Sequence, residues 1–439
     1  MMRQEKYDVA VIGAGLGGLT AASLLSTAGY RTLVVEKLPF VGGRCSTLDY
    51  QGFKLPTGTV WVSEEVHGAL CREVGAEFDI QVPDPQYAFR IGGKDYEAPM
   101  AGILRSMIGR ASRDEAEAAR VMRAFKRAIT WCEPSRSITL YDWLKQYTDN
   151  PTILGIFQIF VAMDTAISHF ELPAGEYFRF IKETSFVKNM GFLPHGGGSL
   201  TFALAKTIES KGNDIWTQCR ALKILVEDGV VRGVVVSKDS EDIEVRAQVV
   251  VCNAGPHIAI DLAGQDHFDA GYVKDVEPTR TRTGPQIIIF VTSDRPLLEG
   301  APMVCLPDAR RVFCLMQYST YCPEMAPKGK HLLEAAAFLT SAEPPYDLDK
   351  EIELCLQDLR DNIPNFDKYG QVLRVNCYHG YWGLMRTWAG YTNLPVVTPI
   401  EGLYNAGDNV APSGWWGSSA AVKSGRMVAE DIIRRYKPA

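Results

Sequence analysis

The segment that decides the fold is Tyr7–Lys37, YDVAVIGAGLGGLTAASLLSTAGYRTLVVEK. Residues 8–12 form a short apolar run, which is typical of a strand buried in a parallel sheet. The small and apolar residues that follow predict a helix over residues 15–28, with Gly29 as its C-terminal stop. Residues 32–35 predict a second strand. Strand, helix and strand in this order predict an α/β fold.

Three glycines, Gly13, Gly15 and Gly18, mark the turn between the first strand and the helix. Gly13 permits a tight turn, Gly15 lets a pyrophosphate approach the backbone, and Gly18 lets the helix pack closely on the strand. Free amide groups at the start of the helix then face the phosphates. Glu36 lies 23 residues after Gly13, where an acid can bind ribose hydroxyls. The segment therefore predicts binding of NAD or FAD; the alternative is a tight turn without a ligand.

Two segments outside this unit favour FAD. Residues 38–44 end in Gly-Gly-Arg, which suits a second loop against the pyrophosphate, with the Arg44 guanidinium neutralising its charge. Near the C-terminus a predicted strand ends in Gly407 and Asp408, and a carboxylate at that place can hold the hydroxyls of a ribityl chain. A helix predicted over residues 418–436 would direct its positive N-terminal end at the anionic edge of a reduced flavin.

Composition and charge limit the class of protein. The chain has 439 residues, enough for two or three domains, and 46% of them are hydrophobic. A net charge of −6 and a pI near 5.8 make a nucleic-acid partner unexpected. Because no apolar run is long enough to span a membrane and the first strand begins too early for a signal peptide, we expect a cytoplasmic protein. The 10 cysteines contain no CxxC pair, which predicts reduced thiols and no metal site. Nothing in the sequence indicates an oligomeric state.

In four separated motifs the chain resembles the flavin-dependent amine oxidase and phytoene desaturase superfamily. The motifs are GAGLGG with Glu36, Gly-Gly-Arg at 42–44, His-Gly-Gly-Gly at 195–198 before a predicted helix, and Gly-Asp at 407–408. The resemblance implies one FAD, with Glu36 on the adenosine ribose, Arg44 beside the pyrophosphate and Asp408 on the ribityl chain. The cofactor-binding residues expected on this basis are Gly13, Gly15, Gly18, Glu36, Lys37, Gly43, Arg44, Gly58, Thr59, Ala221, Gly407, Asp408 and Trp416.

Two details of the expected FAD site follow from residues that differ from those of related enzymes. Ala221 stands where the family has a valine whose backbone touches adenine, so its contact would be through the backbone alone. Residues 407–417 contain no cysteine, although related enzymes place a thioether there, so we expect the FAD to be noncovalent.

The same motifs predict a discontinuous FAD-binding domain over residues 1–65, 194–260 and 395–439. Residues 66–193 and 261–394 are then insertions that form a substrate-binding domain. The expected architecture is α/β: a Rossmann-like FAD-binding domain of the GR2 type, with an α+β substrate domain. Further predicted elements are helices at 113–130, 138–147, 152–168 and 349–362, strands at 286–292 and 312–318, and a hairpin at 224–231 with an Asp-Gly turn.

Candidate substrate residues lie in aromatic segments that the family places near the flavin. Trp415 and Trp416 follow the Gly-Asp motif and are expected to wall an apolar pocket, and residues 57–61 are expected to approach the ring. His379, and His195 beside the glycine loop, are candidate general bases. The alternatives are that the aromatics are ordinary core and that the imidazoles are structural. The catalytic or pocket candidates are Trp415, Trp416, Tyr381 and His379. The last two lie in an upstream aromatic cluster of Tyr378, Tyr381, Trp382, Trp388 and Tyr391.

Two departures from the family bear on the reaction. Pro56 stands where phytoene desaturases commonly carry an acid, which weakens a literal carotenoid assignment. Residues 283–290 lack the lysine that in amine oxidases holds a water at flavin N5. The second departure favours a dehydrogenase or desaturase over an oxidase.

The sequence thus predicts an FAD-dependent dehydrogenase or desaturase that removes a hydride and a proton from a mostly apolar small molecule, forming C=C or C=N. The alternatives are an oxygen-reducing flavin amine oxidase and an FAD-binding scaffold or chaperone without turnover. Arginines and apolar residues over 101–133 suggest peripheral contact with a membrane, and a solvated helix is the simpler alternative.

Overall fold

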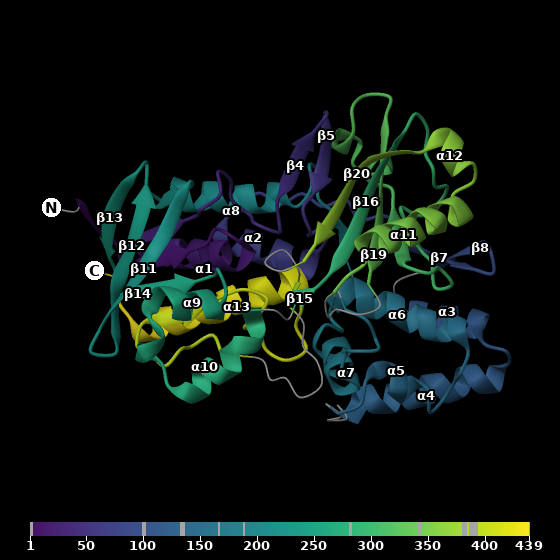
Figure 1. Cartoon of the computed structure of the whole chain (residues 1–439), viewed down its shortest axis with the longest axis horizontal. Coiled ribbons are helices and arrows are strands. Elements are labelled where there is room, and N and C mark those ends of the chain that lie inside the picture. Colours follow the sequence, from purple (N-terminus) through teal and green to yellow (C-terminus); the bar gives the residue numbers. More distant parts are fainter. Residues whose placement is uncertain are drawn as a thin grey trace.

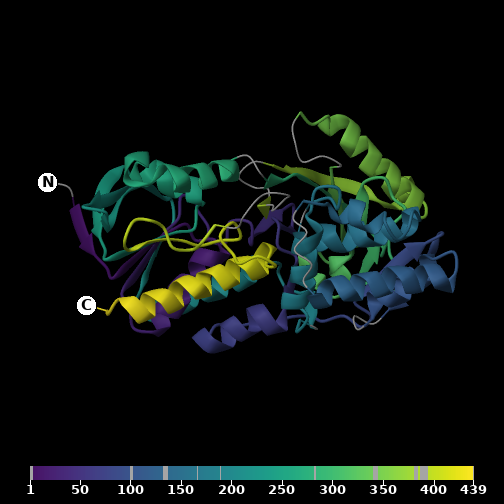
Figure 2. The same cartoon turned by 90° about the horizontal axis from the view of Figure 1, so that it is seen from below.

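A computed structural model describes residues 3–98, 102–131, 137–165, 167–187, 189–280, 283–339, 345–379, 384–385 and 394–438. Two bodies lie side by side, and both chain termini lie at the outer end of the first (Figure 1). A long C-terminal helix, α13 (Gly417–Arg435), runs along the first body with its N-terminal end toward the second (Figure 2).

The first body is built on a parallel sheet of five strands in the order β10, β3, β2, β14 and β22. Their bounds are Asp214–Trp216, Thr32–Val35, Val9–Ile12, Val249–Cys252 and Leu403–Asn405. The three middle strands are buried throughout, as their continuous apolar runs predict. Helix α1 (Leu16–Thr27) contacts α8 (Gly198–Ser210) and α13. The predicted strand–helix–strand unit is confirmed, with α1 one residue shorter at each end.

A second sheet covers the first body in the order β1, β13, β12 and β11. Its strands span Arg3–Lys6, Glu241–Arg246, Val230–Lys238 and Cys219–Glu227. Asp228 and Gly229 join β11 to β12 and both have positive φ, 52° and 75°. A two-residue turn of this kind matches the twist of the flanking strands, so the predicted Asp-Gly hairpin is confirmed, and it is longer than predicted.

The second body holds a sheet of seven strands in the order β20, β16, β19, β18, β17, β7 and β8. Their bounds are Gln371–Tyr378, Gln286–Ser293, His331–Phe338, Val312–Met316, Met303–Cys305, Tyr87–Ile91 and Lys94–Ala98. One face packs on α11 (Leu348–Asn362) and α12 (Phe366–Tyr369). The other face packs on α3 (Ile103–Ala111) and α6 (Pro151–Thr165), beyond which lie α4 (Glu115–Trp131), α5 (Leu140–Leu144) and α7 (Ala174–Glu183).

Shorter elements complete the fold. The strands among them are β4 (Thr47–Tyr50), β5 (Phe53–Pro56), β6 (Trp61–Ser63), β9 (Met190–Phe192), β15 (Thr283–Gly284) and β21 (Leu384–Met385). The helices are α2 (Ala69–Val74), α9 (Pro256–Ala263), α10 (Ala270–Val276) and the single-turn segments Glu64–Gly68, Gln265–His267, Glu277–Arg280, Tyr318–Thr320 and Pro323–Met325.

Two segments pack differently from the predicted domain division. Leu70 and Val74 of α2, and Val276 of α10, are buried in the core of the first body, although residues 66–193 and 261–394 were assigned to the substrate domain. Their apolar side chains pack into the core of the first body, which shields them from water. The parallel strands themselves all fall within the ranges predicted for the cofactor domain.

In the segment suggested as a membrane contact, most apolar side chains are buried, but Leu104 of α3 is half-buried and Trp131 of α4 is 78% exposed. Ile103, Met107 and Ile108 of α3 are buried in the protein interior, at 6%, 0% and 0% exposure. Among the described residues, no helix is both long and apolar enough to cross a membrane.

Candidate functional site

The glycine turn lies where β2 and β3 end. Gly13 has φ of 97° and its N–H donates to the Val35 carbonyl at 2.8 Å, which requires the tight turn that the sequence predicts. A Cβ on Gly18 would lie 2.3 Å from the Gly13 carbonyl oxygen, so only glycine lets α1 approach the strand this closely. A Cβ on Gly15 would lie 2.6 Å from Nδ2 of Asn253.

Asn253, which the sequence analysis did not select, completes this turn. It follows β14, and its Nδ2 donates to the Gly13 carbonyl at 3.4 Å. Its Oδ1 is so near Gly17 and Gly407 that a Cβ on either would lie 2.7 Å or 3.4 Å from it. A signal was present, because parallel strands end at one edge of a sheet and Asn253 directly follows the apolar run VVVC at residues 249–252.

Glu36, at the end of β3, is buried at 6% exposure. Its carboxylate accepts hydrogen bonds from the backbone N–H of Ala14 at 2.8 Å and of Leu38 at 2.9 Å. It thus joins the glycine turn to the loop after β3. Ala221 is half-buried on β11, two residues after Cys219, whose N–H donates to the Glu36 carbonyl at 2.8 Å. Lys37 is exposed.

The second loop and the C-terminal strand meet at the same edge. Arg44 forms two hydrogen bonds with Asp408, at 3.0 Å and 2.6 Å, so the structure pairs two residues that the sequence assigned to separate parts of the cofactor. Burial acts to lower the pKa of Arg44, and the Asp408 charge and hydrogen bonds raise it overall. Thr59 donates its N–H to the Arg44 carbonyl at 3.0 Å, and a Cβ on Gly58 would lie 2.7 Å from that oxygen.

These residues form a cradle that fits a phosphate-bearing cofactor. Gly13, Gly15 and Gly43 keep their backbones partly accessible, while the strands beside them are buried. Gly42 donates its N–H to the Ala14 carbonyl at 2.7 Å, which holds the two glycine loops together. Close approach of a ligand to bare backbone needs residues without Cβ, so the geometry suits a dinucleotide lying across this edge.

The start of α13 has a polar partner that the sequence analysis missed. Buried His67 accepts a hydrogen bond at Nδ1 from the Ser63 N–H at 3.1 Å, so its proton is on Nε2, which lies 3.1 Å from Ser418 Oγ. Burial lowers the pKa of His67 to about 4 and keeps the ring neutral. The Nε2–H therefore donates to Ser418, in the first turn of α13.

The two tryptophans of the C-terminal segment are placed differently from each other. Trp416 is 7% exposed and packs in the helical core of the second body, with its ring centroid 5.0 Å from that of Phe180. Trp416 thus packs as a core residue, because the loop before α13 lies on α7. In the same contact Ser413 Oγ donates a hydrogen bond to the Glu176 carboxylate. Trp415 is partly exposed, with the Lys423 ammonium 5.5 Å from its ring.

The remaining predicted catalytic residues are not brought together within the described chain. His195 is exposed, has a positive φ of 65°, and its carbonyl accepts a bond from Thr47 Oγ1 at 2.9 Å. His379 is exposed directly after β20. Tyr381, with the neighbouring candidates Trp382, Trp388 and Tyr391, lies outside the described residues.

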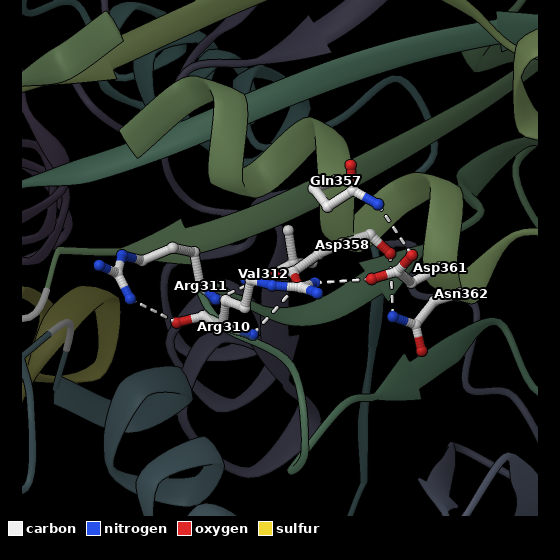
Figure 3. Close-up of polar contacts among 7 residues, drawn as sticks. All are labelled: Arg310, Arg311, Val312, Gln357, Asp358, Asp361 and Asn362. Carbon is white, nitrogen blue, oxygen red and sulfur yellow. Dashed lines mark hydrogen bonds and ion pairs between the residues drawn. The ribbon is translucent and has the colours of Figure 1, made fainter. Parts of the chain in front are cut away.

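A pocket of about 750 Å³ lies in the second body and is lined by charged residues, among them Arg310, Asp358 and Asp361. Asp358 accepts hydrogen bonds from the backbone N–H groups of Arg310, Arg311 and Val312, and Arg310 also contacts Asp361 (Figure 3). These carboxylates fasten α11 to the start of β18. The carboxylates of this pocket thus hold two elements of the fold together, and none of the residues that line the pocket belongs to the glycine cradle.

A parallel sheet with a glycine-rich turn, an acid after the second strand and a C-terminal helix directed at the second body is the arrangement typical of dinucleotide-binding proteins. The model of the flavin-containing amine oxidoreductases matches residues 16–433. The chain belongs to the flavin-containing amine oxidoreductase family.

Known proteins agree with this assignment. The chain is 24% identical to 15-cis-phytoene desaturase of Capsicum annuum over 99% of this chain and 79% of that protein. An oxidoreductase structure from Methanosarcina mazei is 26% identical, with a TM-score of 0.85 over 97% of this chain and 100% of that one. Putrescine oxidase shares the fold at 15% identity, with a TM-score of 0.76 over 99% of this chain and 100% of that one.

Proposed function

We propose that the protein is an FAD-dependent dehydrogenase or desaturase that oxidises a mostly apolar small molecule, forming C=C or C=N. The observation that carries the proposal is the convergence of Gly13, Glu36, Arg44 and Asp408 on one edge of the parallel sheet. These residues come from opposite ends of the chain and match the parts of FAD in order.

Each residue of the cradle has a proposed role. Glu36 binds the adenosine ribose, Arg44 neutralises the pyrophosphate, and Asp408 binds the ribityl hydroxyls. The backbone of Ala221 lies against adenine, and α13 directs its N-terminal end at the pyrimidine edge of the flavin, an arrangement of the GR2 type. When bound, the flavin accepts the hydride.

We also propose that FAD is held without a covalent bond. Residues 407–417 offer no thiol, and Cys45, the nearest cysteine to the second loop, is 3% exposed. Burial raises the pKa of Cys45 to about 12, and its Sγ lies 3.4 Å from the Gly197 carbonyl. A thiol in this state is a poor nucleophile.

Oxidation with oxygen as acceptor is the second candidate, favoured by the family assignment and by the likeness to the putrescine oxidase fold. The dehydrogenase proposal rests on residues 283–290, which contain no lysine, and on the similarity to a desaturase over nearly the whole chain.

We expect the purified protein to be yellow and its visible flavin band to bleach anaerobically with a substrate. Peroxide formed on admitting air would favour the oxidase, and bleaching with re-oxidation by a quinone but little peroxide would favour the dehydrogenase. A yellow protein that no apolar amine, alcohol or polyene bleaches would instead be a scaffold. Acid precipitation is expected to free all of the colour, and colour kept in the pellet would contradict noncovalent binding.

Replacing Glu36 with alanine is expected to weaken FAD binding. A charge-assisted hydrogen bond is worth ~1.5–3 kcal/mol, so the affinity should fall about ten- to a hundredfold. Glu36→Gln should cost less, because the amide oxygen still accepts one bond. Titration of FAD into each apoprotein measures the change, with exposed Glu209 of α8 replaced by alanine as the control. Equal affinity in Glu36→Ala and wild type would remove Glu36 from the site.

A further inference from the structure

Glu334 is a carboxylate buried in the apolar face of the second body. It lies on β19, opposite Phe290 of β16 and Met316 of β18, and is 3% exposed. The residues that surround this face form a hydrophobic cluster that includes Ile288, Met303 and Ala336. Burying a charged group among such residues is costly unless it is paired, so its presence needs a reason.

The carboxylate of Glu334 has a single hydrogen-bond partner within the described chain, the Tyr318 hydroxyl at 2.7 Å. Glu117, which is buried to the same degree, shows what a structural carboxylate receives here. It accepts bonds from the Arg113 N–H, Thr148 Oγ1 and Asn150 Nδ2. Glu334 is thus under-satisfied by comparison.

The cation on the same sheet face is engaged elsewhere. Arg374 of β20, opposite Phe290, donates to Asn376 Oδ1 at 2.7 Å and lies 5.2 Å from the centre of the Tyr50 ring. Asn376 in turn donates to the Tyr378 hydroxyl at 2.9 Å. Among the described residues no ion pair neutralises Glu334.

Burial raises the pKa of Glu334 to about 7, against the Tyr318 hydrogen bond, which lowers it. The other ionisable groups in or against this cluster are thiols, phenols and one guanidinium: Tyr50, Tyr87, Tyr96, Cys305, Cys314, Tyr318, Tyr321, Cys322, Arg374 and Tyr378. Burial raises the pKa of the Cys305 and Cys314 thiols. It also raises the pKa of Tyr318, and raises that of Tyr378 to about 12. These two thiols and two phenols therefore stay neutral over the pH range in which Glu334 changes its charge.

Three aromatic rings form a wall that begins at Tyr318, the partner of Glu334, and ends at Trp61. The Tyr318 ring packs edge-on against Phe192 at 5.3 Å, and Phe192 packs edge-on against Trp61 at 4.5 Å. Trp61 lies three residues after Gly58, which packs on the carbonyl of Arg44. The indole N–H of Trp61 is buried and has no partner in the described part of the chain.

We propose that Glu334, held by Tyr318, is the acceptor that binds one hydrogen-bond-donating group, an amine or a hydroxyl, on an otherwise apolar substrate. The hydrophobic cluster takes the hydrocarbon part, and the aromatic wall runs from this anchor toward the flavin. This inference rests on the proposed function and narrows its substrate class to molecules with a donor at one end.

Three probes with the same ten-carbon alkyl chain test this inference: decylamine, decanol and decanoate. Each is titrated into the FAD-loaded protein, and binding is followed by the flavin difference spectrum and by thermal shift. Wild type is expected to prefer the amine and the alcohol over decanoate. Glu334→Gln is expected to lose about tenfold or more in amine affinity, because it loses the charge. Tyr318→Phe should also lower the amine affinity. Glu353→Gln, at an exposed position of α11, is the control.

The pH dependence separates an anchor from a merely structural carboxylate. In wild type, decylamine affinity is expected to rise from about pH 6 to about pH 8 as Glu334 loses its proton, since the alkylammonium stays charged like a lysine. Glu334→Gln should show no such rise. Unchanged affinities and pH profile in Glu334→Gln, or failure of wild type to bind any probe, would overturn the inference.

These outcomes are distinct from failure of the proposed function. Substrate bleaching that is unaltered in Glu334→Gln would leave the function and remove the anchor. A Glu334-dependent amine preference in thermal shift, without bleaching by any compound, would keep the anchor and remove the dehydrogenase.

Discussion

Gly18→Ala is expected to abolish cofactor retention. The new methyl group would lie 2.3 Å from the Gly13 carbonyl oxygen, 3.1 Å from Asn253 Cβ and 3.2 Å from Val11 Cγ1. Backbone cannot yield as a flexible side chain does, so α1 must move away from β2 and the glycine turn must open. Overpacking of this kind costs ~3 kcal/mol or more, which corresponds to about two orders of magnitude in affinity if it falls on the bound state.

The measurement is the flavin-to-protein ratio after purification, together with the thermal midpoint of the apoprotein. Gly109→Ala is the matched control, because Gly109 lies in α3 and a Cβ there meets nothing within 4 Å. It should keep its flavin and be as stable as wild type or slightly more so, since alanine is the better helix former. Normal flavin content in Gly18→Ala would refute the tight helix–strand contact.

Asp408→Ala is expected to weaken FAD binding by an amount similar to that of Gly18→Ala. Asp408 is 7% exposed at its side chain and Arg44 is 31% exposed, so the variant removes the Asp408 carboxylate from a largely buried guanidinium. Breaking a buried pair costs ~3 kcal/mol, reduced here to ~1–3 kcal/mol because water reaches Arg44. Loss of the proposed ribityl contact adds to this, and we expect FAD affinity to fall more than a hundredfold.

A double-mutant cycle separates the ion pair from cofactor binding. If Arg44 and Asp408 only bind each other, Arg44→Ala with Asp408→Ala should be no worse than either single variant, both in apoprotein stability and in FAD affinity. If each also contacts the cofactor, apoprotein stability should follow that pattern while FAD affinity falls further in the double variant. Affinity restored to the wild-type value in the double variant would exclude both residues from the cofactor site.

The sequence was sufficient where structure is decided by neighbouring residues. The turn at Gly13, helix α1 and strand β3 follow from apolar period and glycine placement within about thirty residues. The hairpin at Asp228–Gly229 follows from turn chemistry alone. Family motifs in fixed order then predicted which distant segments return to the first sheet, and β14 and β22 do so.

Local signals were misleading or silent where burial decides the outcome. Residues 331–338, HLLEAAAF, favour a helix by composition, yet β19 is a strand because it pairs with β16 and β18 on both sides. Strand β18 ends at Met316, before the predicted Tyr318, because a single 3₁₀ turn follows. The sequence did not indicate that Trp416 packs against Phe180 of α7, because that contact depends on how α7 lies against the loop before α13.

The sequence by itself determined the α/β class, the glycine turn with Glu36 and the flavin family. The first two depend on short-range patterns of residues, and the family is indicated by motifs that occur in a fixed order. Only the tertiary structure decided that Arg44 binds Asp408 across 364 residues, that Asn253 fits into the glycine turn and that Glu334 lies in an apolar face. Each of those contacts joins elements that are distant along the chain. Their partners are set by how the sheets and helices pack, which no local pattern of residues records.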